Sequence, residues 1–239
     1  MTMLRSCSRL RNRPKAISRI ILRASSAVAL ICCFAPRAGA DSAPDWLRAA
    51  AQEKLPSYSG DPVAVVLLDE LQTTVQNNGE IDTRHRLAYK LLRPEARDGY
   101  GVALVDFDKQ TKVASFKAWT ITKDGHELSL GEKDALETAL SGDELFSDAR
   151  AKLLRFAEPN PGNIVGYEYV QKARPLLFED HWIFQDKIPV KRARLLLDLP
   201  PGWEFTSSWF NYPEQKPHAS GSNHYVWEIA DLPPWKKNW

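Results

Sequence analysis

From residue 63 onward, hydrophobic and polar positions alternate along the chain with a period of two, the pattern of β-strands that bury one face. Residues 63–75 form the longest such stretch, and the Asn-Asn-Gly sequence at 77–79 predicts a turn into a second strand. In that second strand His85, Leu87 and Tyr89 share one face, which predicts a half-buried hairpin. The same alternation predicts further strands at residues 102–107, 113–122, 152–156, 164–172, 190–199, 203–209 and 225–229.

Turn-forming residues separate these stretches, and helical spacing is confined to two short segments. Residues 42–55 begin with a Pro-Asp pair and place apolar residues at helical intervals, and residues 132–140 predict a short surface helix. Strands without long intervening helices predict an all-β fold, an antiparallel β-sandwich with a short N-terminal helix. We therefore divide the chain into a leader at 1–40, a helix and linker at 41–62, and a β-sandwich domain at 63–239.

The leader differs from the rest of the chain because its 40 residues carry eight basic side chains and no acidic one. An uncharged, largely apolar run covers residues 24–35, and Ala38-Gly39-Ala40 has the small residues of a signal-peptidase site. We therefore expect a bacterial signal peptide, cleaved after Ala40, and a periplasmic or secreted protein without a membrane span.

Two alternatives to cleavage have less support from the sequence. An uncleaved anchor is disfavoured because the apolar run is shorter than the roughly 20 residues that a bilayer core requires. Lipidation at Cys32 or Cys33 is disfavoured because neither cysteine follows a small residue.

Cleavage changes both the cysteine content and the charge of the protein. It would remove all three cysteines, and with them any disulfide, cysteine-ligated metal or cysteine nucleophile. It would also remove eight of the 32 basic residues, which leaves 24 against 30 acidic ones and a formal charge of about −6. This charge disfavours nucleic-acid binding, which needs a basic face.

No pattern in the mature sequence specifies a catalytic or metal site, so we predict no cofactor, no metal and no enzymatic activity. Asp106 and Asp108 imitate the start of a calcium loop, but Thr111 replaces the glycine that such a loop needs. His218 and His224 could supply two zinc ligands, whereas a zinc site needs three or four.

Tryptophan is abundant, with eight residues, six of them in the last quarter of the chain. Alternation places Trp203 and Trp227 on rows that face the core, which is the usual position of large aromatic side chains. The candidate ligand-binding residues are Trp182, Trp209, Trp235 and Trp239. We expect the last two to anchor a segment or partner that docks near the C-terminal end.

The order of several short motifs points to a family. They lie at residues 65–70, 86–92, 116–121 with Asp124-Gly125, 146–150, 161–169, 182–185, 188–190 and 199–203. With these motifs, the chain from about residue 63 to 234 resembles the domain of unknown function found N-terminal to the transglutaminase-like core in exported bacterial proteins. The resemblance implies that a catalytic Cys-His-Asp triad belongs to a downstream core, so no catalytic residue is carried over. The chain would be either a stand-alone module or a truncated reading of a longer gene.

We therefore expect a non-catalytic accessory or binding module that presents strand edges and aromatic loops to a protein partner or to a transglutaminase-like core domain. Two alternatives stay open. One is a domain that binds carbohydrate or cell-wall peptide through its tryptophans, and the other is a cryptic hydrolase that depends on His85 or His181.

Overall fold

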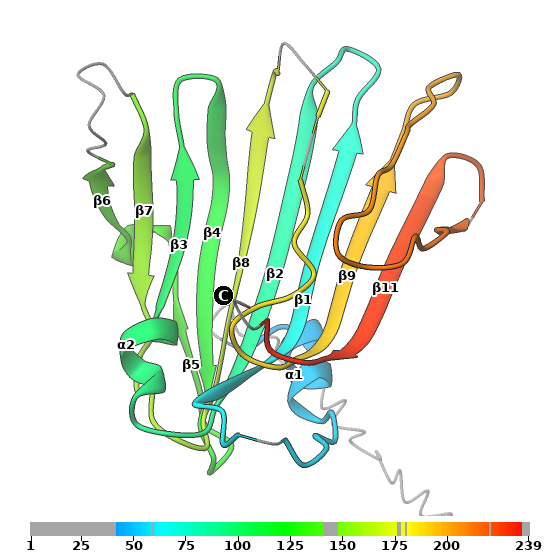
Figure 1. Ribbon diagram of the computed structural model, residues 1–239. Coiled ribbons are helices and arrows are strands. Elements are labelled where there is room, and N and C mark those ends of the chain that lie inside the picture. The colour runs from blue at the N-terminus through cyan, green and yellow to red at the C-terminus, as the bar shows by residue number, and fades with distance from the viewer. Residues whose placement is uncertain are drawn as a thin grey trace, which may run out of the picture. The chain divides into compact units, whose positions relative to one another are not determined.

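The computed structural model describes residues 42–58, 60–140, 148–175, 178–179, 181–219 and 221–235 (Figure 1). The predicted signal peptide and Trp239 lie outside the described residues. The helices are α1 (Asp45–Ala51), α2 (Ala96–Tyr100) and the 3₁₀ helix η1 (Glu132–Asp134). The strands are β1 (Ala64–Val75), β2 (Ile81–Leu91), β3 (Val102–Phe107), β4 (Thr111–Ile121), β5 (Glu127–Leu130), β6 (Leu136–Ala139), β7 (Arg150–Arg155), β8 (Ile164–Ala173), β9 (Val190–Asp198), β10 (His218–Ala219) and β11 (His224–Leu232).

The strands form two sheets of unequal size. The larger sheet has eight strands in the order β10-β11-β9-β1-β2-β8-β4-β5, and the smaller has the order β3-β7-β6. Among the described residues, every strand pair is antiparallel except β1 with β9, which runs parallel. The all-β fold and the short N-terminal helix are confirmed, and this parallel pair is the departure from a purely antiparallel arrangement.

The β1–β2 hairpin forms where the sequence predicts it. Gly79 has a φ of 80°, a conformation that glycine adopts without a steric penalty. The amide of Gln76 donates to the carbonyl oxygen of Glu80 at 2.8 Å and closes the turn. The register then places Leu71 opposite His85 and Glu70 opposite Arg86, so adjacent residues of β1 face opposite sides of the sheet.

We call the side of the large sheet that carries Asp69, His85 and Tyr167 the front face. Its lower part is covered by α2 and the small sheet, whose buried Ala96, Val105 and Leu154 join one hydrophobic cluster with Phe116 and Val165 of the large sheet. The two sheets therefore share a core, as expected of a sandwich, although the smaller one covers only the β4–β8 side (Figure 1).

The opposite side, which carries Glu70, Arg86 and Glu168, is the back face. Helix α1 covers its lower end by packing Leu47, Ala50 and Ala43 of its approach against Leu68 and Trp119. The alternation of faces explains the two clusters, because Leu68 and Asp69 are neighbours in sequence and point in opposite directions. No helix in the described part of the chain has the length and apolar character needed to cross a membrane.

Two predicted elements are wrong. Residues 203–209, predicted as a strand, have no regular secondary structure and belong to the long connection between β9 and β10. Residues 132–140, predicted as a helix, form η1 followed by the exposed edge strand β6. In both segments the local pattern was overridden by tertiary contacts that sequence alone does not reveal.

Candidate binding surface

Two loops cross the front face of the large sheet above its core (Figure 1). The first is the β8–β9 loop, residues 174–189, and the second is the β9–β10 loop, residues 199–217. Aromatic contacts join the loops, since the ring of Phe184 stacks on that of Trp209 with centroids 5.4 Å apart. Phe205 of the second loop contacts Tyr225 and Trp227 of β11 at 4.6 and 5.4 Å. The two loops therefore form one surface, which we call the loop surface.

The loop surface exposes large apolar side chains to solvent. Ile183 is 75% exposed and Phe210 is 82% exposed. Ile183 immediately precedes Phe184, and Phe210 immediately follows Trp209, the two residues of the stacked pair. Phe184 and Trp209 thus pack together across the two loops, while their sequence neighbours Ile183 and Phe210 are exposed. The other exposed large hydrophobic residues of these loops are Phe178, Trp203 and Tyr212.

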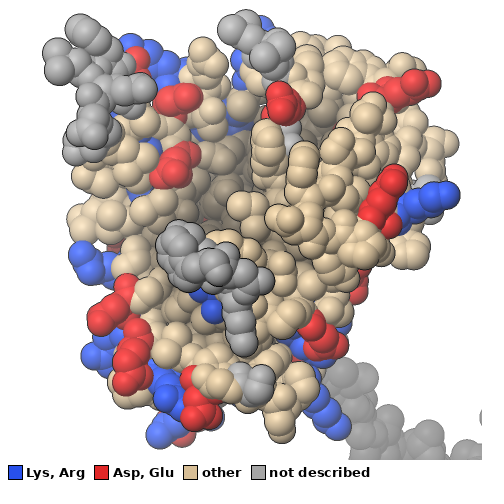
Figure 2. Space-filling view, in the orientation of Figure 1, with Lys and Arg blue, Asp and Glu red and all other residues tan. Residues whose placement is uncertain are grey.

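Charged residues are sparse on this side of the protein. In the space-filling view, uncharged side chains cover most of the face, and the Lys, Arg, Asp and Glu side chains gather toward its margins (Figure 2). An exposed apolar patch with a charged rim is typical of a surface that binds another macromolecule.

A half-buried polar pair lies beneath the β8–β9 loop. The Nε2 atom of His85 on β2 lies 2.7 Å from Oδ1 of Asp69 on β1. Three aromatic rings surround the imidazole edge-to-face, those of Tyr167, Tyr169 and Trp182, with centroids 5.2 to 5.8 Å away. The imidazole is thus enclosed between the sheet and the loop.

The enclosure changes the ionisation of the groups around the pair. Burial raises the pKa of the Asp69 carboxyl, the His85 hydrogen bond partly opposes this shift, and the negative charge of Asp186 adds to it. Burial also raises the pKa of the Tyr89 and Tyr167 phenols, so both stay protonated. A His–carboxylate pair can activate a nucleophile, and here the imidazole is in ring contact with two tyrosines and one tryptophan.

Comparison with family profiles identifies the family of the chain. A family profile described as a domain of unknown function with a solved structure, DUF3857, matches residues 77–236. The chain belongs to the DUF3857 family. No curated protein matches the sequence.

One solved structure of a longer protein contains a similar fold. It is a candidate protease from Parabacteroides distasonis, which superposes with a TM-score of 0.64 at 14% identity over 74% of this chain and 37% of that protein. This chain therefore spans little more than a third of that protein's length, and the likeness shows the fold alone. Yeast LTA4 hydrolase in complex with bestatin gives a TM-score of 0.35 at 10% identity over 80% of this chain and 31% of that one. Neither comparison names a transglutaminase-like core, so that association stays a prediction.

Three of the predicted ligand-binding tryptophans, Trp182, Trp209 and Trp235, lie among the described residues of the DUF3857 domain, and Trp239 lies outside them. Trp182 and Trp209 lie on the two loops and are half-buried, the first against His85 and Phe184, the second against Phe184. Trp235 is 50% exposed, and its amide donates to the carbonyl oxygen of Asp186 at 2.7 Å. The fold thus brings three of the four candidates to the loop surface or its margin.

Other aromatic residues are placed partly as the alternation predicted. Trp227 is buried, and its Nε1 donates to the carbonyl oxygen of Gln215 at 3.2 Å. Trp203 is not core-facing as predicted: it is 37% exposed and meets Phe178 edge-to-face at 5.0 Å. The reason is that its segment is a loop, so its side chains do not follow the alternation of a strand.

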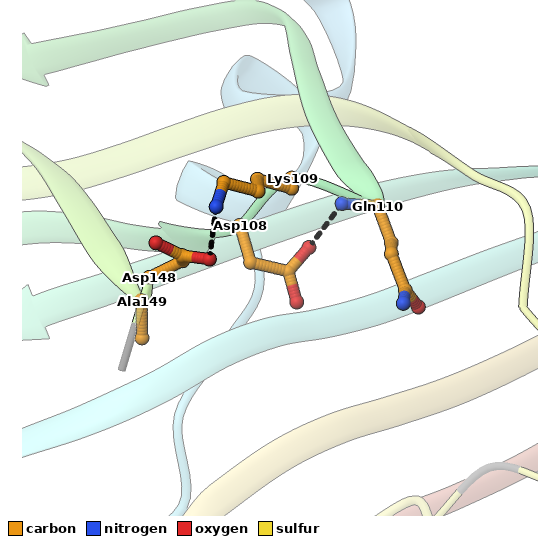
Figure 3. A pocket seen from close by; sticks show the side chains of 5 residues that line it. All are labelled: Asp108, Lys109, Gln110, Asp148 and Ala149. Carbon is orange, nitrogen blue, oxygen red and sulfur yellow. Dashed lines mark hydrogen bonds and ion pairs between the residues drawn. The ribbon is translucent and has the colours of Figure 1, made fainter. Parts of the chain in front are cut away.

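The turn that imitates a calcium loop is closed by its own backbone. Oδ1 of Asp108 accepts the amides of Gln110 and Thr111 at 2.8 and 2.7 Å. Lys109 and Asp148 form an ion pair at 2.5 Å beside it, in an open hollow of about 260 Å³ whose lining also includes Ala149 (Figure 3). The Asp108 carboxylate therefore stabilises the turn between β3 and β4.

Two of the histidines, His224 and His181, each lie beside a carboxylate. His224 pairs with Asp198 through its Nδ1, so it contacts a carboxylate rather than a partner imidazole. His181 is largely exposed, with Nε2 3.8 Å from Glu179. Within the described ranges, no group of three or more His, Cys, Asp or Glu side chains is arranged to hold a metal ion.

The back face carries a row of alternating charges that the sequence analysis did not identify. Glu70 is only 7% exposed. Its carboxylate pairs with Arg86 at 3.1 Å and with Arg194 at 2.6 Å. Strand register continues the row on both sides, so that six adjacent strands contribute one residue each: Lys117, Glu168, Arg86, Glu70, Arg194 and Glu228. The two faces thus differ sharply, with the charges of this row compensated on the back and apolar loops exposed on the front.

Proposed function

We propose that this DUF3857 domain is an exported, non-catalytic accessory module that binds a protein partner through the loop surface of its front face. The observation that carries the proposal is the exposure of Ile183 and Phe210 on two loops whose inner residues pack together. Large apolar and aromatic side chains held on a rigid base lose little conformational freedom on binding, and they supply most of the energy of protein interfaces.

The partner is proposed to be a folded transglutaminase-like core domain. Two observations support this choice. The motifs of the chain resemble the domain that precedes such a core, and the structurally similar P. distasonis protein is much longer than the part that this fold covers. A folded domain with an apolar surface would fit a patch whose charges lie at its margin better than a charged peptide would.

Catalysis is proposed to reside outside this domain. The Asp69–His85 pair is enclosed by three aromatic rings, so a substrate would have to displace the β8–β9 loop to reach the imidazole. We therefore expect no turnover in a broad hydrolase screen, and activity that disappears in His85→Ala would contradict the proposal.

Isothermal titration calorimetry tests the binding function. The chain is titrated with a transglutaminase-like core domain from the same cell, and Ile183→Ser and Phe210→Ser are each expected to weaken binding by at least about tenfold, the effect of a residue at the centre of an interface. Leu136→Ser is the matched control, because Leu136 is 58% exposed but lies on β6 of the small sheet. Absence of binding by the unaltered chain, or an equal loss in Leu136→Ser, would refute the proposal.

A further inference from the structure

Strand β6 is an uncovered edge of the small sheet. It is the last strand in the order β3-β7-β6, and its four residues are all exposed (Figure 1). The amide of Leu140 donates to the carbonyl oxygen of Ala149 at 2.9 Å, so the even-numbered residues of this segment form the backbone hydrogen bonds to β7. The amides and carbonyls of Glu137 and Ala139 therefore point away from β7, where the described residues supply no further strand.

The edge of β6 carries little protection against pairing with another chain. Proteins usually block such an edge with a proline, a bulge, an unpaired charge or a short length. Residues 136–140 contain no proline, and the pairing of β6 with β7 is regular. The only charged side chain of the segment, that of Glu137, is paired with Arg150 at 2.8 Å. Of the four devices, β6 therefore has only its short length.

A row of leucines reaches this edge on the outer face of the small sheet, the face opposite to that of the buried Leu154. The register places Leu104 opposite Leu153, and Leu153 opposite Leu136. Leu104 is 45% exposed, Leu136 is 58% exposed and Leu153 is half-buried. An added strand with an apolar residue opposite Leu136 would extend this row and remove its end from water.

The segment itself has the residues that such an added strand needs. Residues 136–140 read Leu-Glu-Thr-Ala-Leu, with a leucine at each end and threonine in the centre. In an antiparallel pair of two copies centred on Thr138, Leu136 of one copy lies opposite Leu140 of the other. The two threonines lie opposite each other, which is a favourable cross-strand pair. Glu137 lies opposite Ala139, so their outward amides and carbonyls face each other and no like charges are opposed.

We propose that β6 is a self-association edge, through which two copies of this chain pair antiparallel about a two-fold axis at Thr138 and join their small sheets into one continuous sheet. The pairing satisfies the outward backbone groups of Glu137 and Ala139 and continues the leucine row from one copy into the other. Because a four-residue edge buries a small area, the association is weak and depends on the protein concentration. It does not involve the loop surface.

Sedimentation velocity of the purified chain, in a concentration series up to about 1 mM, tests the association. Ala139→Pro removes an outward amide and keeps the hydrogen bonds between β6 and β7, so it should weaken the association constant at least about tenfold, because the two-fold axis removes the bond twice. Leu104→Ser is the matched control, because Leu104 is an exposed leucine of the same row on β3, at the far edge. It should leave the association unchanged.

Three outcomes of this experiment would overturn the inference. A chain that stays monomeric at every concentration would leave β6 to an extended segment of a different protein. Association that Ala139→Pro does not weaken would place the contact elsewhere on the molecule. An equal loss in Leu104→Ser would show a general effect of surface substitutions.

A disulfide tests the register of the pair. Thr138→Cys, in a background whose three native cysteines are replaced by serine, should give a disulfide-linked dimer on mild oxidation, because residues at the two-fold axis lie within disulfide reach. Glu137→Cys is the matched control, because in this register it is displaced from its counterpart by roughly 7 Å along the strand, beyond that reach. Equal linkage of both variants, or none of Thr138→Cys, would contradict the proposed pairing.

Discussion

The ring of Phe184 stacks on the ring of Trp209 at 5.4 Å and 18°, although one belongs to the β8–β9 loop and the other to the β9–β10 loop. This contact joins two segments that have no strand pairing with each other. Ile183 and Phe210, the sequence neighbours of the two rings, are 75% and 82% exposed. The loop surface therefore depends on an aromatic contact between loops rather than on the sheet alone.

Removing that contact should destabilise the protein. Phe184→Ala is expected to lower the free energy of unfolding by about 1–3 kcal/mol, less than a fully buried phenylalanine because Phe184 is half-buried. Urea denaturation measures the change. Phe210→Ala serves as the control, because a side chain that is 82% exposed should contribute less than about 0.5 kcal/mol.

Gly166 on β8 is expected to tolerate no larger residue. A Cβ atom at this position would lie 2.6 Å from Cδ1 of the buried Leu47 and 3.2 Å from the carbonyl oxygen of Leu87. Gly166→Ala should push α1 from the back face and cost about 1–3 kcal/mol in thermal or urea unfolding. Gly131→Ala, where no atom lies within 4 Å of the added carbon, should be close to neutral.

The charge row of the back face predicts a strong effect at its centre. Glu70→Gln would leave Arg86 and Arg194 without their shared carboxylate in a half-buried setting, although each keeps one other acidic neighbour. We expect a loss of about 2–3 kcal/mol in the free energy of unfolding. Asp61→Asn, which breaks an exposed pair with Arg93, should change it by no more than about 1 kcal/mol.

The two His-paired aspartates should affect the pH dependence of stability in opposite directions. Burial raises the pKa of Asp69 in the folded state, so its contribution is present below the ordinary value of 3.8 and declines as the pH rises through the folded-state pKa. Burial also acts to raise the pKa of Asp198, but hydrogen bonds from Gln72, His224 and Thr74 outweigh it and lower the pKa. The stability from Asp198 is therefore present above pH 3.8 and is lost as the pH falls through the lowered pKa.

Urea titrations of the unaltered chain, Asp69→Asn and Asp198→Asn at several pH values check this prediction. Above pH 3.8, the stability of the unaltered chain relative to Asp69→Asn should decrease as the pH rises toward neutrality. Relative to Asp198→Asn, it should increase as the pH rises toward 3.8 and then level off. Slopes of the same sign for both aspartates would show that the environment assigned to one of them is wrong.

If the loop tryptophans bound sugars, their fluorescence would shift when sugars are added. We expect no such shift. Trp182 and Trp209 are half-buried and pack against aromatic neighbours, which reduces the ring area on which a sugar could stack. Tryptophan fluorescence titrated with glycans and muropeptides should therefore show no saturable shift. A shift that disappears in Trp235→Ala would instead support the carbohydrate or cell-wall peptide alternative.

The strands could be predicted from sequence because alternation is a local property. The hairpin turn at Gly79 and the core rows of β2 and β11 follow from spacing alone. In β1 a bulge between Val66 and Leu68 shifts the rows, so that Val66 joins the front cluster and Leu67 the back one, and alternation does not reveal this shift. Asp69 is a polar residue in the otherwise apolar first part of β1, but it can be placed beside His85 only when the pairing register is known.

The remaining features depend on contacts between distant segments. The parallel pairing of β1 with β9 joins residues more than a hundred positions apart, and the back-face row appears only when six strands are in register. The segment around Trp203 has the composition of a strand but is held as a loop by contacts such as Phe178–Trp203 and Phe205–Trp227. Aromatic pairs of this kind carry no signature in residue spacing.

Hydrogen–deuterium exchange on the complex with a transglutaminase-like core domain tests the central claim most directly. Peptides that cover residues 178–189 and 203–212 should become protected on binding, while peptides that carry Glu70, Arg86 and Glu168 on the back face should exchange as in the free chain. Protection confined to the back face, or to the exposed edge strand β6, would show that the apolar loops are not the surface by which this domain binds.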